Sequence, residues 1–457
     1  MNADTFYRYL NRQASSIFIV FLFLAGSVLS VIIPPFQSPD EFEHITRAYL
    51  LGRGEIILTA PAGQSSGGLV DTGLVQYMES YSGLPFHPDK KLTQPDTEAA
   101  KRIQWTGELV FRPALGMAYY FPGIYAVHTT GLKLGELLQV SIDTSYRLTR
   151  ALLLLSCCTI LFYACLLWSP PAMVWALLLI PMSIFQFASA SLDGLATALA
   201  VFVLSAFFRI VTDRKARHTH LFVLLMAAWL LIASSRLQLF PLILLPIVAG
   251  ILLRNYWYVL SALTGAVCVI AWQFLMMKTV VDGRVSLGAS TASIAAHYIQ
   301  NPSQLFDVVS ETLTNSDRMR GYFSSFFGVL GWLDTPFAGK EYIYLLALIL
   351  LVLVCSLSYQ VLSQSKLIGS VLIVCAFGSL AITFFAMLIS WTPHPAKLID
   401  GVQGRYFLIP AILFAYVLCD RLSKEGSVKQ TLVLGLTAAL GVYSLINTVL
   451  LVCNRYY

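Results

Sequence analysis

Residues 15–48 read SSIFIVFLFLAGSVLSVIIPPFQSPDEFEHITRA. An apolar run comes first, two prolines end it, and a cluster of acids follows. The apolar part is about as long as the 20 residues that a helix needs to cross a bilayer. It lacks a small-residue cleavage site, so we interpret it as an uncleaved first membrane span. Asp40, Glu41 and Glu43 follow it directly, beside His44. The stretch therefore predicts a membrane protein with an acidic cluster at the membrane boundary.

The composition of the whole chain supports a membrane protein. Of its 457 residues, 57% are hydrophobic and only 12% are charged, and the mean hydropathy is +0.72. A soluble domain carries about 25% charged residues. The net charge of +6 is small and the Lys and Arg residues lie at the ends of apolar segments, so we expect no nucleic-acid binding. All eight cysteines fall inside apolar runs, which indicates buried, reduced thiols.

Apolar segments of about 20 residues predict a single all-α membrane domain over residues 1–457, with roughly eleven spanning helices. The predicted spans are 15–34, 148–168, 172–190, 193–211, 220–234, 237–253, 258–277, 342–363, 367–390, 405–420 and 430–453. Basic loops such as 212–220 and 420–429 alternate with loops that carry few cations, and Lys and Arg are typical of the cytoplasmic side. This pattern predicts a cytoplasmic N-terminus. Four arginines depart from it at outer helix ends, namely Arg147, Arg150, Arg236 and Arg405.

Two segments are too polar to span a membrane, and we predict that both lie on the outer side. The first covers residues 35–147 and the second covers 278–341, and each contains amphipathic stretches that favour interfacial helices. Within the first, residues 113–136 either lie on the membrane or cross it. The chain shows no internal repeat, so the sequence gives no support to an inverted-repeat transporter.

The acids after the first span allow more than one interpretation. Ser38 and Glu41 form a capping-box pattern with Pro39 at the first helical position, which is sufficient to explain Glu41. Asp40, His44 and Arg47 share one helix face by their spacing. They form either a local ion-pair cluster or part of a reaction centre. A metal site built from Asp40, Glu43 and His44 is the weakest alternative, because no further ligands follow at a recognisable spacing.

Other polar residues are predicted on the same outer side, at the ends of distant spans. Asp193 is either the N-cap of the next helix or a site residue, since an acid at this depth is costly without a partner. Arg405 is either a snorkelling anchor or an anion-binding group at a helix start that Gly401 and Gly404 leave accessible. The remaining candidates are Arg236, Gln238, Lys397 and Gln403.

An acid near several arginines beside lipid is suited to a lipid-phosphate-linked substrate. Arginine matches a phosphate with its planar, permanently charged guanidinium group. A carboxylate can accept the proton of an attacking hydroxyl. We therefore predict Asp40 and Glu41 as catalytic residues, and His44, Arg47, Asp193, Arg236, Gln238, Lys397, Gln403 and Arg405 as substrate-binding residues.

Five motifs carry a resemblance to a known family: SPDEFEHITRAYLLGRG (38–54), YYFPGIYAVHTTGLKLGELLQVS (119–141), ASASLDGLATALA (188–200), FGVLGWLDTPF (327–337) and GVQGRYFLIP (401–410). Together they resemble a bacterial polytopic family of unknown function that is assigned to the GT-C glycosyltransferase superfamily. The PDE start is also similar to that of lipid A aminoarabinose transferases. There, and in protein O-mannosyltransferases, an acid in the first outer loop is essential, and its counterpart here is Asp40, with Glu41 second.

The resemblance implies a GT-C-like fold and an inverting hexosyltransferase in the bacterial inner membrane, with its active site facing the periplasm. The donor would be a polyprenyl-phosphate sugar. The acceptor would be a periplasmic glycan or lipid-linked acceptor, such as an O-antigen of lipopolysaccharide or another cell-envelope polysaccharide, as in O-antigen glucosyltransferases. We expect membrane lipids as further partners and no metal or other cofactor. The alternatives are a transporter or flippase of a lipid-linked sugar, and a scaffold protein without chemistry.

Overall fold

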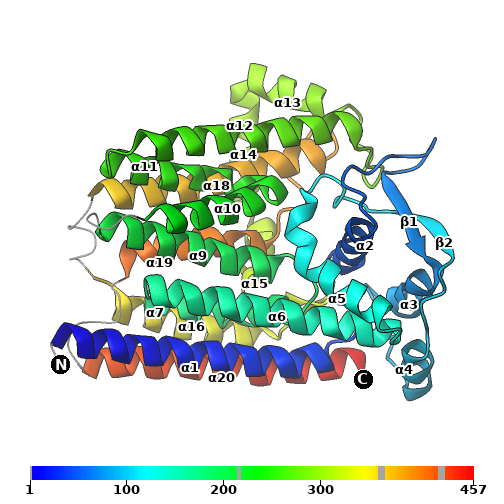
Figure 1. Ribbon diagram of the computed structural model, residues 1–457, viewed down its shortest axis with the longest axis horizontal. Coiled ribbons are helices and arrows are strands. Elements are labelled where there is room, and N and C mark those ends of the chain that lie inside the picture. The colour runs from blue at the N-terminus through cyan, green and yellow to red at the C-terminus, as the bar shows by residue number, and fades with distance from the viewer. Residues whose placement is uncertain (1–2, 214–217, 359–365, 420–427) are drawn as a thin grey trace.

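The chain folds into a bundle of helices that run side by side, with residues 41–113 of the first polar segment at one end (Figure 1). The computed structural model describes residues 3–213, 218–358, 366–419 and 428–457. Residues 359–363 of the predicted span 342–363, residue 420 of the predicted span 405–420, and residues 214–217 and 420–427 of the two basic loops lie outside these ranges. We call the end that carries residues 41–113 the loop end. The last residues of the chain also lie at this end (Figure 1).

Seven described helices are long and apolar enough to cross a membrane. They are α1 (Ala3–Ile32), α6 (Ile142–Leu167), α9 (Asp193–Thr212), α12 (Tyr256–Thr279), α16 (Gly339–Ser356), α18 (Lys366–Ser390) and α20 (Val428–Tyr456). Shorter apolar helices complete the bundle: α10 (Thr219–Ser235), η2 (Leu237–Ile243) with α11 (Leu244–Leu252), and η3 (Gly404–Phe407) with α19 (Leu408–Leu418). A polytopic helical membrane protein is thus confirmed.

The prediction of one span over residues 172–190 is wrong. This segment forms two short helices, α7 (Ala172–Leu178) and α8 (Pro181–Phe187). Pro181 restricts the residue before it to extended backbone, and Ile180 accordingly has φ −66° and ψ 155°. Both short helices are buried throughout, so their continuous apolar pattern reflects the bundle core rather than contact with lipid. Helix α9 is also central, since its residues from Gly194 to Phe207 are all buried.

The first polar segment contains more than interfacial helices. It holds α2 (Glu41–Gly52), α3 (Thr72–Ser82), α4 (Gln94–Lys101), η1 (Pro122–Tyr125) and α5 (Ala126–Leu137). It also holds two antiparallel strands, β1 (Gly67–Asp71) and β2 (Leu109–Pro113), which pair Gly67 with Pro113 and Asp71 with Leu109. Residues 113–136 form no candidate membrane span, because α5 has only 12 residues and the four-residue helix η1 before it leaves the helical stretch too short.

The second polar segment forms α13 (Thr291–Gln300), α14 (Pro302–Thr314), α15 (Ser316–Gly328) and the short pair β3 (Val329–Leu330) and β4 (Thr335–Pro336). Its helices have an apolar cluster of their own, in which Ile294, Tyr298 and Tyr322 pack with Leu388 of α18 and with Ile399. This cluster fixes residues 399–404 against α15, directly before the helix that carries Arg405. The second polar segment thus positions the turn that precedes Arg405.

Candidate functional site

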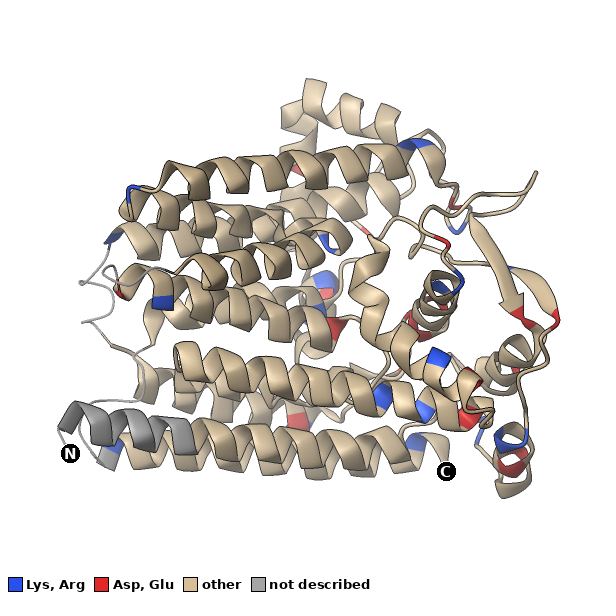
Figure 2. Cartoon of the chain, in the orientation of Figure 1, with Lys and Arg blue, Asp and Glu red and all other residues tan. Residues whose placement is uncertain are grey.

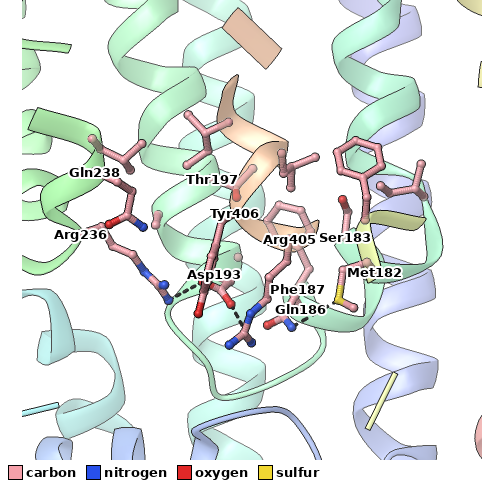
Figure 3. A pocket seen from close by; sticks show the side chains of 17 residues that line it. Met182, Ser183, Gln186, Phe187, Asp193, Thr197, Arg236, Gln238, Arg405 and Tyr406 are labelled. Carbon is pink, nitrogen blue, oxygen red and sulfur yellow. Dashed lines mark hydrogen bonds and ion pairs between the residues drawn. The ribbon is translucent and has the colours of Figure 1, made fainter. Parts of the chain in front are cut away.

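Four charged residues from four distant parts of the chain form a continuous chain of ion pairs. Arg405 Nη2 lies 3.1 Å from Asp40 Oδ2, and Arg405 Nη1 lies 3.2 Å from Asp193 Oδ2. Asp193 Oδ1 also pairs with Arg236 Nη2. The order is therefore Asp40–Arg405–Asp193–Arg236. Figure 3 shows Asp193 between the two arginines. We call these four residues the ion chain.

Three members of the ion chain, Asp193, Arg236 and Arg405, line a pocket between α8, α9, η2 and η3. Asp40 is not a lining residue and is connected to the pocket through its ion pair with Arg405. Asp193, Arg236, Gln238, Arg405 and Tyr406 line its polar part, and Figure 3 shows their polar groups close together. Other lining residues, such as those at 196, 239 and 409, are apolar and lie further along the helices. The pocket thus has a charged part and an apolar part.

The pocket has a volume of about 40 Å³, room for only a few waters. An anion that binds Arg405 must therefore replace one of the partners that Arg405 already has. Asp40 is the more accessible of the two, because 33% of its side chain is exposed, against 17% for Asp193. Arg405 itself is only 4% exposed. The geometry favours displacement of Asp40.

The local backbone explains how Arg405 and Asp40 reach each other. A Cβ on Gly404 would overlap the backbone nitrogen of Phe326, so only glycine lets η3 approach α15 this closely. Ser325 Oγ accepts a hydrogen bond of 2.8 Å from the Gly404 amide and fixes this contact. Asp40 has left-handed backbone, with φ 63° and ψ 10°, and its side chain makes no capping bond to α2. Its carboxylate is thereby directed to Arg405.

The predicted capping box is only half formed. Helix α2 begins at Glu41, and the backbone amide of Ser38 donates a 3.2 Å hydrogen bond to Glu41 Oε2. The hydroxyl of Ser38 instead donates to Gln186 Oε1. Asp193 is likewise not an N-cap: it is the first residue of α9, where the positive end of the helix dipole favours an acid.

Glu41 lies in a buried network and not in the pocket, which corrects its assignment as a second catalytic acid. Its side chain is fully enclosed and pairs with Arg150 at 3.2 Å. Glu41 Oε1 also accepts hydrogen bonds of 2.6 Å from Tyr146 Oη and from the Ala190 amide. Arg150 donates further bonds to the carbonyls of Ile33 and Pro34. Glu41 therefore positions the chain on both sides of the ion chain: the turn before α2 and the turn before α9.

His44 and Arg47 form no ion pair with Asp40, so the predicted local ion-pair cluster of these three residues is wrong. His44 Nδ1 lies 2.9 Å from Tyr125 Oη. Burial, and secondarily the charge of Arg236, lowers the pKa of His44 well below its usual value, so its ring is neutral. Arg47 donates to the carbonyl oxygens of Glu55 and Ile56 at 2.9 and 2.6 Å. Arg47 therefore fastens the chain that follows α2.

The structure places one of the remaining predicted residues at the pocket and the others away from it. Gln238 lines the pocket, as predicted. Gln403 lies two residues before Arg405 and has a buried Oε1 without a hydrogen-bond partner, but it is not among the lining residues. Lys397 is exposed in the loop before η3 and forms no ion pair with any residue that the structure describes. We therefore remove Lys397 from the site.

Several residues of the site were not among the predicted ones. Gln186 lines the pocket and accepts hydrogen bonds from Ser38 and Ser191. Tyr120 lies over Arg236, with the guanidinium carbon 5.9 Å from its ring centre. The sequence did indicate Arg150, because it is a cation at a helix end predicted to lie on the outer side. It did not indicate Gln186 or Tyr120, since neither breaks the pattern of charges along the chain.

Within the described ranges, no three His, Cys, Asp or Glu side chains lie close enough together to hold a metal ion. The absence of a metal from the reaction stays a prediction. What the residues present can do is bind an anion through two arginines and accept a proton at the partly exposed carboxylate of Asp40.

Comparison with known proteins gives one match. A family described as "Predicted membrane protein (DUF2142)" matches residues 21–415, a range that includes all four members of the ion chain. No curated protein and no solved structure matches the chain.

Proposed function

This chain belongs to the family described as "Predicted membrane protein (DUF2142)", and we propose that it is an inverting glycosyltransferase of the GT-C type. It moves a sugar from a polyprenyl phosphate to a glycan or lipid-linked acceptor on the periplasmic side of the bacterial inner membrane. One observation carries the proposal: Asp193, Arg236 and Arg405 line one pocket that has a charged part and an apolar part, and Asp40 forms an ion pair with Arg405.

The donor phosphate binds at the two arginines. Their guanidinium groups match phosphate oxygens, and their burial strengthens the interaction, because few waters compete. Asp193 holds both arginines in place by pairing with each of them. The prenyl chain extends from the phosphate into the surrounding lipid. The position of the two arginines thus sets the depth at which the bond between the sugar and the phosphate lies.

Transfer is a single displacement. The acceptor hydroxyl oxygen attacks the anomeric carbon, and its proton passes to the carboxylate of Asp40. The bond between the anomeric carbon and the phosphate oxygen breaks, and its electron pair leaves with the polyprenyl phosphate. Arg405 and Arg236 stabilise the negative charge that grows on this leaving group. A phosphate leaves without a general acid, so one base is sufficient.

The Asp40–Arg405 pair gives the reaction an order. Before the donor binds, Arg405 holds the carboxylate that must act as the base. When the donor phosphate takes its place on Arg405, Asp40 is released to accept a proton. The donor therefore binds before Asp40 can act as the base, so the acceptor hydroxyl is not activated while the donor is absent.

A flippase is the competing function, and the distribution of charge argues against it. A transporter needs polar groups at mid-membrane depth that both sides can reach. Figure 2 shows most charged residues of the described chain at or near the loop end and only a few at the opposite end. A one-sided arrangement suits an enzyme whose donor and acceptor meet on one face.

The proposal is tested by incubating purified protein with a panel of polyprenyl-phosphate sugars and candidate glycan acceptors. Release of free polyprenyl phosphate, together with extension of the acceptor, is the expected result. Movement of intact donor across proteoliposomes without any release would instead establish the flippase.

A further inference from the structure

Glu43 is a carboxyl near the ion chain that the proposed reaction does not use. It lies three residues after Asp40, in the first turn of α2. Its side chain is partly buried, and its Oε2 atom is enclosed without a hydrogen-bond partner. Among the residues that the structure describes, no cation lies within ion-pair distance of it. A carboxylate buried in this way is costly unless it carries a proton.

The charged groups around Glu43 are already engaged elsewhere. Arg112 of β2 donates from Nε to Thr46 Oγ1 at 3.1 Å, and Arg284, which follows α12, pairs with Asp282 at 2.8 Å. Asp40 faces Glu43 from the start of α2, and His44 beside it is neutral. Further out, the exposed acid of α3, Glu79, acts on Arg112.

These surroundings determine the protonation of Glu43. Burial, and secondarily the charge of Asp40, raises the pKa of Glu43 to about 7, while Arg112 and Arg284 oppose the shift only weakly. Because the pKa is raised, the side chain is a neutral acid below about pH 7 and becomes ionised as the pH rises through 7.

We propose that Glu43 sets the charge of the donor site: as a neutral acid it lets the pocket accept an anionic phosphodiester, and its ionisation weakens that binding. The two acids and two arginines of the ion chain sum to zero charge. An ionised Glu43 would add a negative charge beside Asp40 and repel the donor phosphate. This role rests on the proposed function, since it assumes a phosphate at Arg405 and Arg236.

The test measures the affinity of purified protein for decaprenyl methyl phosphate, a diester whose single charge is constant between about pH 6 and pH 8. For the wild-type protein we expect affinity to fall roughly tenfold over this range, because one added negative charge near the phosphate opposes its binding through a partly hydrated medium. Glu43→Gln should bind tightly with no pH dependence. The matched control Glu79→Gln should behave as wild type, because Glu79 is exposed.

A second measurement follows the proton itself. The infrared difference spectrum of wild type minus Glu43→Gln should show the carbonyl band of a protonated carboxyl at about pH 6 that is lost by about pH 8. Absence of the band at low pH, or the same pH dependence of affinity in Glu43→Gln as in wild type, overturns the role of Glu43 and leaves the transferase intact. Failure of wild type to bind the diester at any pH overturns the proposed donor, and the role of Glu43 with it.

Discussion

Replacing Asp40 with asparagine separates the two roles that the structure gives this residue. The asparagine side chain is close in size to that of aspartate, but it can neither take up the acceptor proton nor hold Arg405 by charge. A positioned base contributes about 10²–10⁴-fold to a rate, so transfer should fall by that factor. Donor binding should respond in the opposite direction, because the phosphate no longer competes with a carboxylate at 3.1 Å from Arg405.

The size of the gain in affinity follows from the exposure of the pair. Arg405 is buried but Asp40 is 33% exposed, so we assign the pair the upper part of the range for exposed pairs, about 1 kcal/mol. This corresponds to roughly fivefold tighter binding of a polyprenyl phosphate.

The assay measures polyprenyl phosphate binding and sugar transfer on the same purified preparations. Asp400→Asn is the matched control, because Asp400 also pairs with an arginine, Arg318, and is partly exposed outside the ion chain. It should leave both quantities unchanged. Weaker binding by Asp40→Asn would refute the displacement of Asp40 by phosphate, and retention of near-full transfer would refute its role as base.

Three further predictions follow from the same contacts. Arg405→Gln should weaken polyprenyl phosphate binding by roughly 10- to 100-fold, the value of a lost charge-assisted hydrogen bond. The control Arg318→Gln should bind polyprenyl phosphate normally. Equal affinities of the two variants would exclude Arg405 from the phosphate site. Glu41→Ala should lower the free energy of unfolding by about 3–5 kcal/mol, because it leaves Arg150 buried and unpaired, and a thermal melt in detergent that matches wild type would contradict this. Gly404→Ala should reduce transfer at least about tenfold by moving Arg405 away from α15, with donor affinity falling in parallel; normal kinetics would show that the close approach is dispensable.

The helical architecture was predictable because membrane spans obey a simple length and hydropathy rule. The rule failed at residues 172–190, because this apolar run is buried inside the bundle and does not contact lipid. The strands β1 and β2 were missed because the Gly- and Ser-rich stretch before residue 71 lacks the alternation that marks a strand.

The site was predictable in part, since charge placement carries information in a membrane protein. Arg236 and Arg405 broke the pattern of basic cytoplasmic loops, and the structure brings both to Asp193. Sequence could not distinguish Asp40 from Glu41, because what separates them is the direction of the side chain. The left-handed backbone of Asp40 directs it to Arg405, and Glu41 points to Arg150 inside the bundle. The direction of each side chain is set by partners that are distant in the sequence.

The most direct test of the proposed function is a cryo-electron microscopy structure of the purified protein with a bound polyprenyl phosphate. We expect the phosphate in contact with Arg405 and Arg236, Asp40 released from Arg405, and the prenyl chain extending into the surrounding lipid. A phosphate bound elsewhere, with the Asp40–Arg405 pair intact, would contradict the proposed function.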